Sequence, residues 1–189
     1  SGTGCGDKYS VWTTGDVELE SHARVYGADG NNTSNQTTDY AAGQSQSAFD
    51  TFAFTSADLD QVKALARTRG TYYRGTVSFT SVPNGLIFVD TVSGTNPTSS
   101  TPATDLATVT IGPGAFADAT GFHGWIVVNG NIAFNGTFGG IAGMVYAVGD
   151  VTMTGMGQAG VTGFMIVQRI LDTESKSARN ANVTYNCAA

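Results

Sequence analysis

A phrase built around glycine recurs in this chain, and its period limits the folds that the chain can adopt. Each copy opens on a glycine, runs as a short apolar stretch into a turn, alternates apolar and polar residues, and closes on another glycine. The opening glycines, Gly124, Gly143 and Gly163, lie 19 and 20 residues apart. A unit of this length is too short for a strand–helix–strand crossover and cannot bury a hydrophobic face alone. The period therefore predicts a coil of short strands, each pairing in parallel with its equivalent one turn further on.

The same phrase returns near the start of the sequence. Residues 11–21 align with residues 145–155, and both carry valine, an aromatic residue and Gly-Asp-Val in the same order. Residues 85–90 match the first half of the Gly124 copy. We therefore expect the N-terminal segment to form a turn of the same coil. The predicted fold is a mostly all-β, parallel β-solenoid made of a single domain over residues 1–189, with a loop-and-helix segment inserted at about residues 28–84.

One α-helix is predicted within that insertion, at about residues 56–69. Thr55 or Ser56 can serve as the N-cap, acidic residues occupy the first turn, and basic residues occupy the last. Gly70 follows, where helices commonly end in a left-handed residue. One apolar stripe runs along the helix, with Leu65 on its flank, and consists of Leu59, Val62 and Ala66. Such a helix either caps the open end of the solenoid or covers one of its sides.

Composition argues against two classes of partner. The formal net charge is −6, and only nine residues are basic. Nucleic acid is therefore not expected, because phosphate backbones require a dense positive surface. No stretch of the chain approaches the ~20 apolar residues of a membrane span. We expect an export or anchoring segment to have been removed ahead of residue 1, so that the membrane is a partner only through a missing N-terminal helix.

The two cysteines, Cys5 and Cys187, stand at opposite ends of the chain. Their spacing fits neither a metal site nor a redox motif. If the first and last turns of the coil adjoin, the two thiols can form a disulfide, worth roughly 4–5 kcal/mol in the chain-entropy interpretation. The alternative is two unrelated buried thiols. A disulfide implies an oxidising compartment, and hence an exported or surface protein.

Catalysis and metal binding receive little support from the residues. The histidines are His22 and His123, and neither lies in a nucleophile, relay or metal-binding pattern. Three residues of a polar loop could offer oxygen ligands to calcium, but their spacing matches no complete calcium loop: Asp29, Asn31 and Asp39. The prediction is no catalytic residue, no cofactor and no metal.

Two sets of residues are candidates for binding at the surface. Asp16 and Asp150 follow turn glycines, and Asn131 holds the equivalent place in the Gly124 copy. Turn chemistry explains Asp and Asn there, although a stacked ladder of the three could bind a cation or a sugar. Among the aromatics, Trp12 and Tyr146 align, and Trp125 sits one place earlier. Such rings could stack on glycans, but rings in repeat strands more often fill a core.

The tandem of glycine phrases over residues 124–167 resembles the C-terminal region of PilX-type type IV pilus accessory proteins, a group of minor pilins. The helix with the following Gly70-Thr-Tyr-Tyr, and the closing Val183-Thr-Tyr-Asn-Cys187, are also similar to that group. Members carry an N-terminal hydrophobic helix, which this sequence lacks. The resemblance implies a non-enzymatic role in priming assembly, at the tip of the filament or in contacting a surface.

The favoured hypothesis is thus an exported structural or adhesive component of a type IV pilus-like filament. Its partners would be other pilin subunits or pilus assembly proteins and possible surface glycans, and its location the cell surface, reached through the periplasm. The second hypothesis is a carbohydrate-active or carbohydrate-binding extracellular β-helix with a groove of Asp16, Asp90 or Asp150. The third is a subunit of an extracellular fibre built by end-to-end stacking of solenoids.

Overall fold

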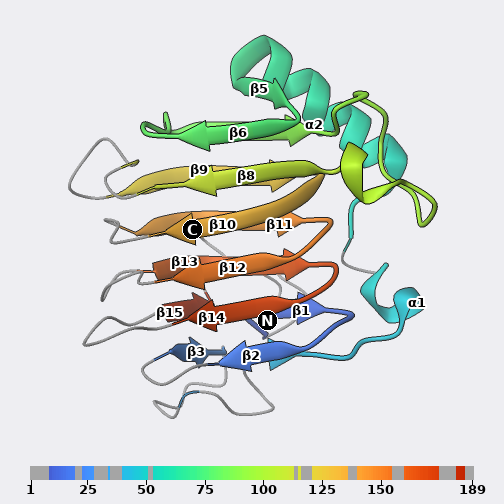
Figure 1. Cartoon of the computed structure of the whole chain (residues 1–189). Coiled ribbons are helices and arrows are strands. Elements are labelled where there is room, and N and C mark those ends of the chain that lie inside the picture. Colours follow the sequence, from blue (N-terminus) through green and yellow to red (C-terminus); the bar gives the residue numbers. More distant parts are fainter. Residues whose placement is uncertain are drawn as a thin grey trace, which may run out of the picture.

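The chain winds into a solenoid of parallel strands arranged as two facing sheets (Figure 1). The computed structural model describes residues 9–19, 23–27, 34, 40–50, 53–112, 115, 121–135, 140–154, 160–174 and 182–185. The 9-stranded sheet has the order β3 (Arg24–Tyr26), β15 (Asn182–Tyr185), β13 (Gly160–Val167), β11 (Ile141–Ala147), β9 (Phe122–Val128), β7 (Gly85–Asp90) and β5 (Thr71–Arg74). Off this path, β1 (Val11–Thr13) pairs with β13, and β4 (Tyr40–Ala41) pairs with β1. The 6-stranded sheet has the order β2 (Val17–Leu19), β14 (Leu171–Glu174), β12 (Val151–Thr154), β10 (Gly130–Asn135), β8 (Ala107–Ile111) and β6 (Thr76–Phe79).

The register of the strands confirms the repeat that the sequence predicts. Gly143 pairs with Gly124 on one side and with Gly163 on the other. Gly85 pairs with Gly124, as the match of residues 85–90 requires. At the other end Val11 pairs with Met165, so the N-terminal strand stacks on the last copy of the phrase. The fold is therefore the expected mostly-β parallel solenoid, and segments far apart in sequence form adjacent turns.

The glycines at these positions form a column in the 9-stranded sheet. Gly85, Gly124, Gly143 and Gly163 have φ angles of +107°, +146°, +140° and +150°, values that only glycine adopts readily. A Cβ atom on Gly143 would collide with the carbonyl oxygen of Gly124, and one on Gly163 would collide with that of Gly143. The turns can therefore stack at normal strand spacing only because Gly124, Gly143 and Gly163 carry no side chain.

Apolar side chains fill two separate cores. The inner core lies between the two sheets and is formed by alternate residues of every turn, including Phe134, Val145, Val151 and Met153. The outer core lies on the opposite face of the 9-stranded sheet, where Phe88, Val127 and Tyr146 are buried beneath other segments. The 9-stranded sheet is thus apolar on both faces, as expected for buried parallel strands.

Helix α2 (Ser56–Arg69) packs on the outward side of the 9-stranded sheet against β5 and β7, at the upper end of the coil in Figure 1. Its buried stripe of Leu59, Val62 and Ala66 packs in the outer core, while Leu65 is exposed. Thr55 is the N-cap: its hydroxyl accepts a hydrogen bond from Asp58 N at 3.1 Å, and the Asp58 carboxylate accepts one from Thr55 N at 3.0 Å. A short helix α1 (Gln46–Phe49) precedes it, and a 3₁₀ turn spans Ala103–Asp105.

Two expectations from the sequence were wrong. Gly70 has φ −128° and is not left-handed; a Cβ there would meet the Leu86 carbonyl, so close packing on β7 is what favours glycine. The inserted segment also ends at Gly70 instead of about residue 84, because β5 and β6 form a turn of the coil themselves. They pair with β7 and β8 respectively.

We predict that Gly143→Ala destabilises the protein more than Gly85→Ala. Both substitutions strain a positive φ, at about 1–3 kcal/mol, but a Cβ on Gly85 has open space around it. The collision at Gly143 should add about 1–3 kcal/mol of overpacking. Urea unfolding of both variants measures the difference. Equal midpoints would mean that the column does not require close approach of the backbones.

Candidate functional site

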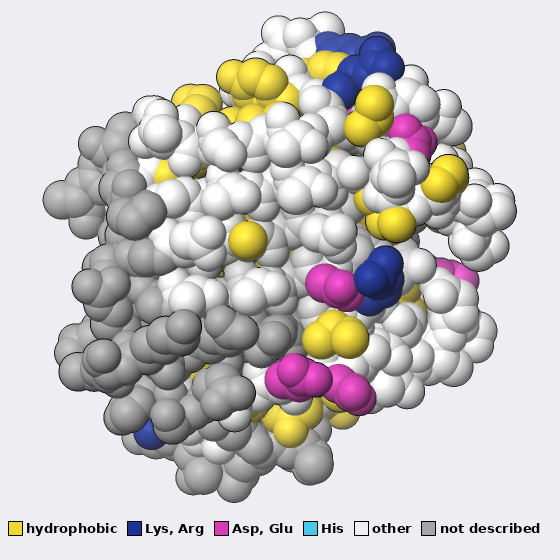
Figure 2. All heavy atoms as spheres, viewed as in Figure 1, with side chains coloured by type: hydrophobic (Ala, Val, Ile, Leu, Met, Phe, Trp, Pro, Cys, Tyr) yellow, Lys and Arg dark blue, Asp and Glu magenta, His cyan; other side chains and the backbone are white. Residues whose placement is uncertain are grey.

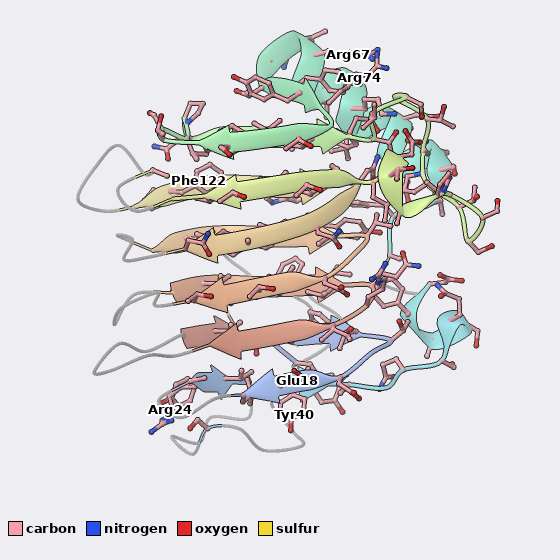
Figure 3. All side chains as sticks on the ribbon, viewed as in Figure 1. Glu18, Arg24, Tyr40, Arg67, Arg74 and Phe122 are labelled. Carbon is pink, nitrogen blue, oxygen red and sulfur yellow. The ribbon has the colours of Figure 1, made fainter. Side chains whose placement is uncertain are left out.

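The outward side of β6, β8, β10 and β12, called here the hydroxyl face, is a continuous uncharged surface. Strand register aligns Ser78, Thr110, Ala133 and Thr152 in one row across four turns. A second row contains Thr76, Thr108 and Asn131. Figure 2 shows polar, uncharged side chains over these strands, with charges gathered toward the margins. Figure 3 shows Arg74 near one end of the coil and Glu18 on β2 near the other.

Two of the aromatic candidates, Trp12 and Tyr146, lie on the outward side of the 9-stranded sheet but are buried there. Trp12 is 6 % exposed and Tyr146 is 3 % exposed, because the chain between β4 and α2 packs over them. The Tyr146 hydroxyl accepts a hydrogen bond from Phe54 N at 3.1 Å. Burial raises the pKa of Tyr146 to about 12. These two rings are core residues and do not offer a binding surface.

Trp125 is the exposed ring of this region. Its side chain is 41 % exposed, and its ring centroid lies 6.1 Å from that of Phe54. The sequence alignment placed Trp125 one position before Trp12 and Tyr146, but the strand register puts it two positions earlier, because Trp125 pairs with Met144 and Tyr146 pairs with Val127. That two-residue offset keeps Trp125 on the outward side of the sheet, where it pairs with Leu86 and Met144. Met144 is buried in the outer core at this place, whereas the larger indole ring stays partly exposed.

The Asp and Asn residues after the turn glycines hold neighbouring turns together. Asn131 Oδ1 accepts a hydrogen bond from Asp150 N at 2.8 Å, and Asp150 Oδ1 accepts one from Ile170 N at 3.1 Å. Asp150 also pairs with Arg169 at 3.1 Å. Val17 pairs with Leu171, which puts Asp16 next to Ile170 and away from Asp150. The expected ladder of Asp16, Asp150 and Asn131 is therefore interrupted, and the two members that adjoin bond to backbone.

The most densely bonded polar group in the described part of the chain is the Lys63 cluster, formed by Lys63, Tyr72, Asp90 and Asn129. Lys63 Nζ lies 2.7 Å from Asp90 Oδ2, and Tyr72 donates a hydrogen bond to the same oxygen at 2.8 Å. Asn129 Nδ2 donates to Asp90 Oδ1 at 2.9 Å, as does the Thr91 amide. Helix α2, strands β5 and β7 and the corner between β9 and β10 thus meet at one carboxylate.

Burial makes this cluster unusual. Asp90 and Asn129 are fully buried, and Lys63 is 8 % exposed. Lys63 Nζ completes its hydrogen bonds with Gly94 O at 3.1 Å and Asn96 Oδ1 at 3.0 Å. Within the described residues Asn129 Oδ1 has no hydrogen-bond partner. Every proton of the ammonium is used, whereas the amide oxygen beside it is left unpaired.

Competing effects act on the charge of Asp90. Desolvation raises the pKa of this carboxyl, but the hydrogen bonds from Lys63, Asn129, Tyr72 and the Thr91 amide outweigh it, and the net pKa is lowered. The pKa of Tyr72 is raised, chiefly by burial and by its bond to Asp90. Arg67 stacks on the Tyr72 ring at 4.4 Å. These hydrogen bonds therefore favour the ionised form of Asp90, although the carboxylate is fully buried.

Sequence reasoning treated Lys63 only as a helix-end cation, Asp90 as a groove acid and Asn129 as part of a turn. One signal pointed to the cluster: Lys63 lies on the same face of α2 as Leu59, Val62 and Ala66, where a cation needs a buried partner. Asp90, as that partner, is not part of an open groove with Asp16 and Asp150. The spacing of residues along the sequence could not identify Asp90 as the partner of Lys63, because only the docking of α2 on the sheet brings the two side chains together.

The remaining candidates gave no site. His123 is exposed, and its backbone amide donates to Asn84 Oδ1 at 2.9 Å. In the described ranges there is no group of three or more His, Cys, Asp or Glu residues that could hold a metal ion, and no helix long and apolar enough to cross a membrane. The other residues considered above lie outside the described part of the chain: Cys5, His22, Asp29, Asn31, Asp39 and Cys187.

Comparison with known proteins identifies no family. No protein-family model matches the chain, and no curated protein matches it. Among solved structures, a glycosylated ice-binding protein (LeIBP) from Arctic yeast aligns with a TM-score of 0.44 and 9 % identity. The alignment covers 96 % of this chain and 92 % of that chain. The resemblance to PilX-type proteins therefore stays a prediction.

We predict that Lys63→Met costs about 3–5 kcal/mol of unfolding free energy, because it leaves the Asp90 carboxylate buried without its cation. The matched control is Arg169→Met, which breaks the ion pair with Asp150. The side chains of that pair are 53 % and 35 % exposed, so its loss should cost no more than about 1 kcal/mol. Denaturant unfolding measures both, and losses of similar size would contradict the assignment of Lys63 as a fastening residue.

Acid should weaken the same contact. The folded pKa of Asp90 is below its unfolded value, so its contribution is fully present above about pH 4. It is lost as pH falls through the folded pKa, because the proton must then be bound in both states. The free energy of unfolding of the wild type should therefore fall more steeply than that of Asp90→Asn as the pH drops below about 4. Parallel curves for the two proteins would contradict this prediction.

Proposed function

We propose that this chain is a non-enzymatic, exported structural or adhesive component of a type IV pilus-like filament. The observation that carries the proposal is that the separate stretches resembling PilX-type proteins are adjacent in space. The glycine phrases form β9 to β13, the closing Val183 stretch lies in β15 next to β13, and α2 packs in the outer core. Stretches that resembled PilX-type proteins only by chance would have no reason to lie together in the fold.

The form of the molecule suits a scaffold that presents a surface. Stacked turns give a rigid body because each turn bonds to its neighbours through continuous parallel ladders. The hydroxyl face offers rows of short polar side chains without net charge. Such a face suits contact with uncharged, hydroxyl-rich surfaces, which are the partners of an adhesive role. Other pilin subunits or pilus assembly proteins would be the partners inside the filament.

A carbohydrate-binding β-helix is the second candidate. The exposed Trp125 ring with Phe54 beside it favours this reading over the others, because exposed aromatic rings stack on sugars. The acidic residues give no support to a carbohydrate-active enzyme, since Asp90 is buried in an ion pair and Asp150 is bonded to Arg169 and Ile170.

The test is association with filaments in the native host. We expect the upstream reading frame to encode a prepilin leader followed by an apolar helix, and the protein to co-purify with sheared filaments. Immunogold labelling should then mark the filaments or their tips. A conventional secretion signal, with the protein free in the medium and absent from filaments, would contradict the proposal.

The adhesive part can be examined separately with a matched pair of variants. Ala133→Arg adds a charge at the centre of the hydroxyl face, and Leu65→Arg adds one on the exposed side of α2. Filaments carrying Ala133→Arg should adhere less well, and those carrying Leu65→Arg should adhere like the wild type. Equal adhesion of both would remove the hydroxyl face as the contact surface.

A further inference from the structure

The Lys63 cluster contains three groups that can react with one another: an amine, an amide and a carboxylate that touches both. Asp90 Oδ2 lies 2.7 Å from Lys63 Nζ, and Asp90 Oδ1 lies 2.9 Å from Asn129 Nδ2. The carboxylate thus bridges a nucleophile on α2 and an electrophile at the corner between β9 and β10. All three side chains are buried.

We propose that Lys63 and Asn129 form an intramolecular isopeptide bond, with Asp90 as the group that transfers the protons. The Lys63 amine attacks Cγ of Asn129, a C–N bond forms, and the bond from Cγ to Nδ2 breaks. Nothing is oxidised or reduced, and no co-reactant is needed. This inference is independent of the filament role, because it concerns only how α2 is fastened to the coil.

The protons balance within the cluster. The Asp90 carboxylate first takes a proton from the Lys63 ammonium, leaving a neutral amine with a free electron pair. As the C–N bond forms, Asp90 passes that proton to the departing amide nitrogen and receives a second one from the attacking nitrogen. The product is a secondary amide, and the released ammonia takes the remaining proton and leaves as ammonium. Asp90 ends as the carboxylate that it was at the start.

The surroundings of Lys63 orient the amine for this step. After one proton moves to Asp90, two remain, and Gly94 O and Asn96 Oδ1 can accept them. The electron pair then lies where the third proton was, on the side of Asp90 Oδ2, and the Asn129 amide is bonded to the other oxygen of the same carboxylate. Asn96 is itself held, since its Nδ2 donates to Asp60 Oδ1 at 2.8 Å. The low local dielectric favours the neutral pair over the ion pair more than water would.

The state of Asn129 is consistent with a reacting amide. Its Oδ1 is buried and has no hydrogen-bond partner within the described residues. An unpaired carbonyl oxygen in a buried site is costly for a residue with a purely structural role. The Phe88 ring, 5.7 Å from Lys63 Nζ, helps to keep this side of the amine away from water. Burial would also protect the new bond from hydrolysis.

The mass of the purified, denatured and thiol-reduced protein tests the proposal. We expect a mass lower than that of the sequence by one ammonia molecule. Protease digestion should yield one branched peptide joining the segments that contain Lys63 and Asn129. Lys63→Met, Asp90→Asn and Asn129→Ala should each show the full mass of their own sequences, whereas Arg169→Met should keep the deficit. Should a cluster variant fail to fold, the wild-type mass and its branched peptide still decide the question.

Three results would overturn it. The first is a wild-type mass equal to that of the sequence. The second is a deficit that persists in Lys63→Met, which would assign the lost ammonia to ring closure at Asn129-Gly130. The third is a deficit of one water molecule with a branched peptide joining Lys63 to Asp90, which would make Asp90 the partner in the bond instead of the proton carrier.

Discussion

The parallel stacking of backbones is the constraint on which the rest of this structure depends. Each turn donates and accepts hydrogen bonds along the coil, and successive turns must approach to strand spacing at every position, including the corners. The column of Gly85, Gly124, Gly143 and Gly163 meets this demand on the 9-stranded sheet, since each has a positive φ and the last three leave no space for a Cβ. At another corner Asn131 and Asp150 use their side chains to bond the amides of the next turn. Asn131 and Asp150, which the geometry of a single turn would explain, thus also hold adjacent turns of the coil together.

The two sheets use their outward faces differently, and this divides the molecule into a covered side and an open side. The outward face of the 9-stranded sheet is apolar, so it has to be covered, and α2 with the preceding segment provides the cover over Phe88, Val127 and Tyr146. The outward face of the 6-stranded sheet carries short hydroxyl side chains and needs no cover. The chain therefore begins at one end of the coil, runs outside the apolar sheet to the other end, and winds back until its last turns adjoin its first.

The Lys63 cluster stands where that outer segment is attached to the coil. Apolar packing along α2 is not directional, whereas the bonds from Lys63, Tyr72 and Asn129 to one carboxylate fix the helix at a single position on the sheet. A buried ion pair is expensive to form and more expensive to break on one side. A covalent bond at the same place would remove the equilibrium between docked and undocked helix altogether.

The amino-acid pattern was enough to predict the period of the coil, the register of its glycine phrases, the return of residues 11–21 to the same coil and the residues that form α2. These features follow from local rules: a fixed repeat, backbone angles open only to glycine, and capping residues at a helix start. The folded structure was needed to establish that Trp12 and Tyr146 are buried while Trp125 is exposed, that β5 and β6 form a turn of the coil, and that Lys63 and Asn129 both bond to Asp90. The reason is that burial and the pairing of distant side chains depend on which segment covers which face, and no spacing along the chain encodes where a helix comes to rest on a sheet.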